Sequence, residues 1–271
     1  MTIDPLTYAR RWKTLAVLSL SLLIIGLDNT ILNVALPSLQ REFDTSASTL
    51  QWIVDAYLLV FAGLLLTMGT LGDRFGRKLA LQCGLVLFGG ASLAVLVVQS
   101  AGQLIAVRAA MGAGGALIMP ATLSIISNVF PREERGKAIG IWAGMAAVGI
   151  ALGPLFGGLL LECFDWSSVF VLNVPVAALA LLLGLRFVPR SRDPEPGAFD
   201  LVGAGLSVGA LVALSIRSSR RPTAAGPTAA SSGALVPRWC SAVRSCSASS
   251  ELASRCSTCG SCAIRASAWR R

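Results

Sequence analysis

Six long stretches of the chain consist almost wholly of apolar and small residues, and short segments richer in charge separate them. At about 1.5 Å of rise per residue, a helix of about 20 residues covers the hydrocarbon core of a bilayer, which is roughly 30 Å thick. The pattern therefore predicts six membrane-spanning helices. They lie at about residues 14–36, 51–71, 79–98, 103–129, 138–161 and 166–185, and only Asp28, Asp55 and Arg108 interrupt them with charge.

The basic residues of the connections predict the orientation of these helices. Twelve of them lie before the first stretch, between the second and third, between the fourth and fifth, and after the sixth, whereas the alternate connections hold only Arg41. Cytoplasmic loops of membrane proteins carry an excess of Lys and Arg. We therefore expect a multi-pass protein of the cell membrane, with residues 1–13, the turn at Gly69–Lys78 and the loop at 188–200 in the cytoplasm.

Composition supports a membrane protein and argues against an enzyme. The 271-residue chain is 54% apolar and 14% charged, and its mean hydropathy is +0.70. A soluble domain of ordinary composition does not carry this much apolar surface. The first stretch, about 23 residues long, exceeds the roughly 7–15 apolar residues of a signal peptide and is predicted to be retained. The chain has no His and no recognisable nucleophile motif, so we expect no catalysis.

The end of the chain differs in composition from the rest. Residues 1–216 are nearly neutral, whereas residues 217–271 hold nine Arg, the single acid Glu251 and five of the seven Cys. An apolar run at residues 201–216 stops at this boundary. We predict a partial seventh span for that run, because 16 residues fall short of the ~20 that a span requires.

Three interpretations of residues 217–271 compete. An Arg-rich arm for nucleic acid or anionic lipid would explain the charge, but the arginines are scattered without aromatic residues between them. A metal or iron–sulfur site at Cys256, Cys259 and Cys262 lacks a nearby fourth ligand. The mixture of Arg, Ser, Ala, Pro and Cys favours a coding region translated out of frame. We expect this segment to be disordered and predict no nucleic-acid partner.

The turn between the second and third stretches carries the most specific motif of the chain. Glycines let two helices reverse direction within a few residues, and an acid beside three bases at helix ends can form ion pairs that change with conformation. The motif resembles the cytoplasmic signature loop of the major facilitator superfamily, which implies a gate. An ordinary loop would explain the bases but not the acid and its flanking glycines. The motif residues are Gly69, Leu71, Asp73, Arg74, Gly76, Arg77 and Lys78.

Two acids inside the predicted spans are candidates for handling protons. The segment Leu27–Pro37, which contains Asp28, resembles the first-span signature of the fourteen-span drug:proton antiporters. Because charge in lipid is costly and marks functional sites, we expect Asp28 to exchange a proton. A structural bond from Asp28 to a neighbouring helix is the alternative. Asp55, near the outer end of the second span, is a second candidate, with an interfacial acid that reaches water as its alternative.

The fourth stretch adds a buried base. Arg108, Gly112, Gly115 and Met119 follow one another at spacings of four, three and four and therefore share a helix face. This pattern resembles the fourth-span motif of the same family, although Met111 replaces its usual polar residue. The resemblance implies that Arg108 assists proton movement. A structural pair with an acid on a neighbouring helix is the alternative.

The fifth stretch contains a ridge of small residues. Gly149, Gly153 and Gly157 recur every four residues beside Pro154 and Gly158. Such spacing lets another helix approach closely, and the proline removes one backbone hydrogen bond. The run resembles the antiporter motif of major facilitator exporters, which implies a packing seam that favours export.

Together these motifs predict an all-α integral membrane fold, with the N-terminal six-helix bundle of a major facilitator superfamily transporter at residues 14–187. The resemblance implies export of amphipathic or cationic compounds such as drugs, driven by the proton gradient without a cofactor, with membrane lipid and a small-molecule substrate as partners. Such transporters rock two bundles around a central site. Because the resemblance covers only the first bundle, two alternatives stay open: a non-transporting truncated or frameshifted fragment, and a half-transporter that dimerises.

Overall fold

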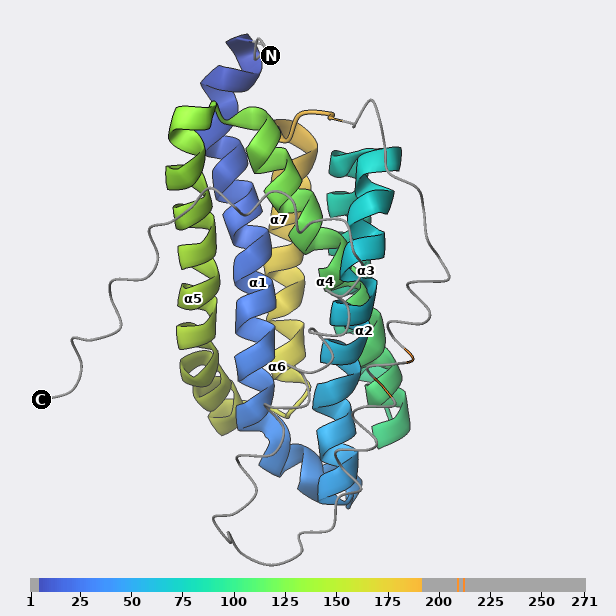
Figure 1. Ribbon diagram of the computed structural model, residues 1–271. Coiled ribbons are helices and arrows are strands. Elements are labelled where there is room, and N and C mark those ends of the chain that lie inside the picture. Colours follow the sequence, from blue (N-terminus) through green and yellow to red (C-terminus); the bar gives the residue numbers. More distant parts are fainter. Residues whose placement is uncertain (1–4, 192–208, 210–211, 213–271) are drawn as a thin grey trace, which may run out of the picture. The chain divides into compact units, whose positions relative to one another are not determined.

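The computed structural model describes residues 5–191 together with Gly209 and Val212. Within these residues, six helices are long and apolar enough to cross a membrane (Figure 1). A 3₁₀ turn at Val95–Val97 extends α3, and the sixth span consists of the short α6 followed by α7; the described residues form no strand. The predicted fold class and all six spans are therefore confirmed. The helices are α1 (Pro5–Phe43), α2 (Ala47–Phe75), α3 (Arg77–Ala94), α4 (Ala101–Val129), α5 (Arg132–Cys163), α6 (Ser168–Val171) and α7 (Asn173–Phe187).

Three predictions fall on other parts of the chain. The loop at residues 192–200, the partial seventh span and the segment 217–271 with its cysteine cluster all lie outside the described residues. Gly209 and Val212 are the exceptions, and both are helical.

The first helix is longer than its apolar stretch. α1 begins at Pro5, so the basic residues expected in a segment before the span are already helical. Arg11 fixes this extension, because its Nε lies 2.9 Å from Oε2 of Glu134 on α5 and its guanidinium carbon lies 3.6 Å from the ring centre of Tyr8. Trp12 packs edge-on against Phe130 at 5.5 Å between ring centres. These contacts between distant segments explain why hydropathy underestimated the helix.

Local sequence sets the other helix ends. The hydroxyl of Ser46 accepts a hydrogen bond from the amide of Thr49 at the start of α2, and Ser100 does the same for Gln103 at the start of α4. Serine at this position satisfies an amide that has no partner inside the helix. Between α2 and α3 stands Gly76 with φ of 119°, a value that favours glycine and lets the chain reverse within one residue.

The packing places α1 and α4, the most buried of the long helices, at the centre of the bundle. α1 packs mainly against α5, and α4 packs mainly against α2 and α3. Figure 1 shows α5 alongside α1, with the N-terminal end of α1 and the α2–α3 turn at the same end of the bundle. The outer side of α5 keeps large apolar side chains exposed, among them Ile150, Leu155 and Leu159. Such a surface suits a helix bordered by lipid or by a second bundle.

Candidate functional site

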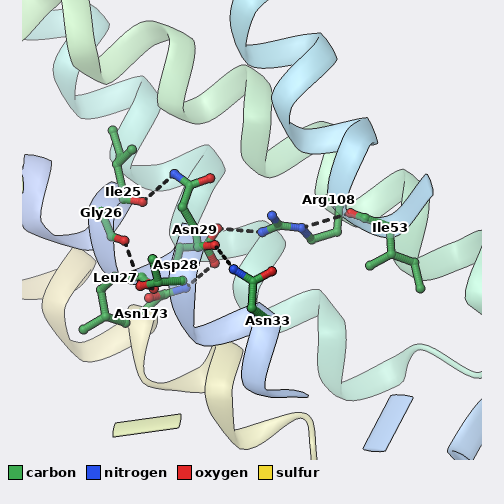
Figure 2. Close-up of polar contacts among 10 residues, drawn as sticks. Ile25, Gly26, Leu27, Asp28, Asn29, Asn33, Ile53, Arg108 and Asn173 are labelled. Atoms are coloured by element: carbon green, nitrogen blue, oxygen red, sulfur yellow. Dashed lines mark hydrogen bonds and ion pairs between the residues drawn. The ribbon is translucent and has the colours of Figure 1, made fainter. Parts of the chain in front are cut away.

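Asp28 lies in the middle of α1 with 0% of its surface exposed. Oδ2 accepts a hydrogen bond from Nη1 of Arg108 on α4 at 2.6 Å, and Oδ1 accepts one from Nδ2 of Asn173 at the start of α7 at 2.9 Å. Figure 2 shows the two donors reaching Asp28 from different sides. The two charges that the sequence placed in separate spans therefore form one ion pair between α1 and α4. The hydrogen bond from Asn173 adds α7 to this cluster.

Arg108 is equally enclosed, with 1% exposed. Its Nε donates to the backbone oxygen of Ile53 on α2 at 3.4 Å, and its guanidinium carbon lies 4.4 Å from the ring centre of Tyr57 and 6.0 Å from that of Phe170. Aromatic faces attract cations, so the two rings supplement the carboxylate. Burying a charge pair costs solvation energy, and removing one partner typically costs about 3–5 kcal/mol. Loss of either partner would therefore leave an uncompensated charge inside the bundle.

The sequence did not indicate roles for Asn173, Tyr57 and Phe170 in this site. Asn173 is the only amide side chain in the stretch 166–185, and that was one available signal. Phe170 and Asn173 also match the family's entry into its sixth span, whereas Tyr57 gave no comparable signal, because an aromatic residue in an apolar stretch is an ordinary core residue.

Two amide side chains of α1 near the ion pair, those of Asn29 and Asn33, donate hydrogen bonds within their own helix. Nδ2 of Asn29 donates to the oxygen of Ile25 at 2.8 Å, and Nδ2 of Asn33 donates to the oxygen of Asn29 at 3.4 Å. Figure 2 shows both amides on α1. Asn33 is exposed and Asn29 is half-buried, whereas Asp28 turns inward to α4 and α7. α1 thus presents an amide-lined face beside the buried ion pair.

Asp55 does not belong to this cluster. It is half-buried on α2, two residues beyond the Ile53 carbonyl that contacts Arg108. Within the described part of the chain, Asp55 forms no hydrogen bond and no ion pair. The structure brings Asp28 and Arg108 together and leaves the third candidate apart from them.

The motif at Gly69–Lys78, named the gate motif after the role that the resemblance implies, forms a compact ionic turn. Asp73 in the last turn of α2 accepts a hydrogen bond at 2.8 Å from Nε of Arg77, the first residue of α3, and one at 3.1 Å from the hydroxyl of Ser124 on α4. Lys78 donates to the backbone oxygen of Leu185 on α7 at 2.8 Å. Arg74 is exposed and lies over Phe75 at 6.0 Å. The acid of the motif therefore ties α2 to both α3 and α4, and Ser124 is a partner that the sequence did not reveal.

Glycines of the motif also allow close packing. A Cβ at Gly69 would lie 3.4 Å from Cβ of Pro120, and one at Gly72 would lie 3.2 Å from Cβ of Ala80. Together with the reversal at Gly76, these positions hold the ends of α2, α3 and α4 near one another.

The ridge on α5 packs against α1. A Cβ at Gly149 would lie 2.5 Å from the backbone oxygen of Leu23 and 3.0 Å from the amide of Leu27, and one at Gly153 would clash with Thr30. A Cβ at Gly157 would lie 3.0 Å from Cγ1 of Ile31. The other two residues of the motif are not in this contact: Pro154 is exposed, and a Cβ at Gly158 would meet nothing within 4 Å.

Comparisons with known proteins agree with this architecture. Residues 18–247 match the family model described as Major Facilitator Superfamily. A crystal structure of a bacterial homolog of the human lysosomal transporter Spinster, inward-facing and unoccupied, matches with a TM-score of 0.56 and 22% identity, over 70% of this chain and 45% of that one. At this identity the match concerns the fold alone.

Curated relatives are more similar in sequence. The multidrug efflux pump LfrA of Mycolicibacterium smegmatis is 49% identical over 207 residues, which are 74% of this chain and 40% of that protein. The methyl viologen resistance protein SmvA of Salmonella typhimurium is 42% identical over 206 residues, 76% of this chain and 42% of that protein. The puromycin resistance protein pur8 of Streptomyces alboniger is also 42% identical, with 76% and 41% covered. The chain spans about two fifths of the length of these relatives.

Proposed function

Because the chain belongs to the major facilitator superfamily, we propose that it forms the first bundle of an exporter that moves amphipathic or cationic compounds out of the cell in exchange for protons. Three relatives, an efflux pump and two resistance proteins, support export of toxic compounds. Two such bundles close over a substrate from opposite sides in this fold.

The buried pair of Asp28 and Arg108 carries the proposal of proton coupling. A proton on Asp28 would neutralise the carboxylate and weaken its bond to Arg108. The guanidinium would then keep the Ile53 oxygen and the faces of Tyr57 and Phe170 as partners. The two protonation states would thus correspond to two sets of contacts for Arg108 on α4: one with α1, α2 and α6, and one with α2 and α6 alone. An ion can shift a conformational equilibrium only through such a difference in contacts.

The amide-lined face of α1 supports a path for the exported compound beside this pair. Asn33 is exposed and Asn29 half-buried in the bundle, one turn apart on the same helix. Amide groups can bond polar parts of a compound without fixing one charge pattern, which suits export of varied molecules.

A chimera tests the proposal. Residues 1–216 of this chain, joined to the C-terminal bundle of a relative, should extrude a fluorescent cationic dye from cells that lack their own exporters. A protonophore should stop the efflux, because it removes the proton gradient. A chimera that reaches the membrane but never lowers dye accumulation would contradict the proposal.

The 271-residue chain expressed alone should extrude no dye, because alternating access needs two bundles. Efflux by the chain alone, lost when an inactive copy is mixed in, would instead support a dimer of half-transporters. Dye accumulation in cells that produce only this chain therefore separates the two possibilities.

We also expect the N-terminal end of α1 to face the cytoplasm. In a variant without native cysteines, Cys introduced at Ser48 or Gly102 should react with an impermeant thiol reagent added outside, whereas Cys at Gly136 should react only after permeabilisation. All three positions are exposed, so accessibility in the protein does not limit the reaction. The reverse labelling pattern would overturn the orientation.

A further inference from the structure

A pocket of about 470 Å³ lies where the end of α2, the start of α3 and the end of α7 meet. It is at the end of the bundle that carries the basic connections. Lys78, Gln82, Arg190 and Ser191 supply its polar lining. It lies apart from the Asp28–Arg108 pair and shares only Gly76 and Lys78 with the gate motif.

The lining is rich in positive charge and in hydrogen-bond donors. None of the described residues that line the pocket is acidic. Among the residues that the structure describes, no carboxylate pairs with Lys78 or Arg190, and Nε2 of Gln82 is buried without a hydrogen-bond partner. Asp73, the acid of the gate motif, is already bonded to Arg77 and to Ser124. The electrostatics of the pocket are therefore complementary to an anion.

The start of α3 adds to this potential. No side chain caps the helix, and its first turn contains no acid. The N-terminal end of a helix carries a partial positive charge and favours anions such as phosphate. Lys78 belongs to this first turn, so its charge and the helix dipole act at the same place.

An apolar rim surrounds the basic lining. Phe75, Leu79 and Leu185 border the pocket and are 63%, 53% and 54% exposed. A soluble anion would make no use of these side chains, whereas acyl chains of a lipid would pack against them. Basic residues at the cytoplasmic ends of membrane helices attract anionic headgroups of the inner leaflet.

We propose that this pocket binds an anionic phospholipid of the inner leaflet. Lys78, Arg190 and Gln82 hold the headgroup phosphate, and the acyl chains lie along Phe75, Leu79 and Leu185. The lipid bridges the gate motif and the end of α7, which Lys78 already joins through its bond to the Leu185 carbonyl. The proposal depends on the orientation of the bundle and is independent of the exported compound.

Native mass spectrometry of the purified 271-residue chain tests the site with phosphatidylglycerol and phosphatidylcholine of the same acyl chains. The chain should bind phosphatidylglycerol more tightly. Lys78→Gln combined with Arg190→Gln should lower that affinity roughly tenfold or more, because each basic residue contributes to the attraction of an anionic lipid. Arg10→Gln combined with Arg132→Gln removes the same charge from exposed positions on α1 and α5 and should change the affinity by less than about twofold.

Two further variants keep the test decisive if the double Gln variant does not fold. Lys78→Arg combined with Arg190→Lys retains both charges and should retain the preference for phosphatidylglycerol. Gln82→Leu retains them too but removes the unpartnered donor, and should weaken binding severalfold. Equal binding of the two lipids, or equal losses in the pocket and control pairs, would overturn the proposal. Displacement of phosphatidylglycerol by inorganic phosphate of equal affinity would assign the pocket to soluble anions and overturn it as well.

Discussion

Replacing Asp28 with Asn should abolish dye efflux driven by a pH gradient in the chimera while leaving the protein in the membrane. The amide can still accept a hydrogen bond from Arg108, but it carries no charge and exchanges no proton. We expect the rate of pH-driven efflux to fall on the order of a hundredfold or more, as for loss of a group that transfers protons. The measurement is the initial rate of dye efflux after an imposed pH jump in proteoliposomes.

A double variant distinguishes a role of the Asp28–Arg108 pair in proton coupling from a purely structural role. Asp28→Asn leaves the Arg108 charge uncompensated in a fully buried position and should cost about 3 kcal/mol, at the low end for breaking such a pair. Adding Arg108→Gln removes the second charge and should restore most of this stability. A purely structural pair would then regain pH-driven efflux, whereas a coupling pair would not. Retained pH-driven efflux in either variant would remove Asp28 from the coupling mechanism.

The variant Arg108→Lys tests whether the positive charge alone supports efflux. Lysine keeps the positive charge but loses the planar guanidinium, which here contacts Asp28, the Ile53 oxygen and two aromatic rings at once. We expect an efflux rate between those of the unaltered protein and Arg108→Ala. Equal rates for the Lys variant and the unaltered protein would show that charge alone explains the role of Arg108 and would contradict this expectation.

Replacing Gly149 with Ala should separate α1 from α5. The added Cβ would lie 2.5 Å from the backbone oxygen of Leu23, and a backbone atom cannot move aside as a flexible side chain can. Overpacking of this kind costs about 1–3 kcal/mol. Because Leu27 also borders Gly149 and directly precedes Asp28, the same change should displace the ion pair and slow pH-driven efflux. Thermal unfolding of the purified chain gives the stability change.

Gly158→Ala is the matched control on the same helix. A Cβ there meets nothing within 4 Å, and Ala favours helix over Gly by about 1 kcal/mol. We therefore expect an unchanged or slightly raised melting temperature. Equal melting temperatures for the two variants would contradict the close contact of α5 with α1.

The arrangement of spans followed from the sequence because bilayer thickness dictates helix length and because lipid offers no partner to unpaired backbone groups. Long apolar runs therefore marked all six helices. The ends of the helices were less predictable. α1 starts at Pro5 because Arg11 bonds Glu134 on α5 and Trp12 packs on Phe130, and these contacts involve residues far apart in the chain.

The sequence by itself identified Asp28 and Arg108, since charge is rare in apolar spans, and the glycine ridge, since a run of small residues marks a helix contact. Only the tertiary structure decided their partners. Arg108 is 80 residues from Asp28, and Asn173 is 145 residues from it, so helix packing alone brings the three together. Periodicity placed Gly149, Gly153 and Gly157 on one face but did not specify α1 as the neighbour. Periodicity indicates which face of a helix makes a close contact, whereas the identity of the opposing helix depends on how all the helices pack.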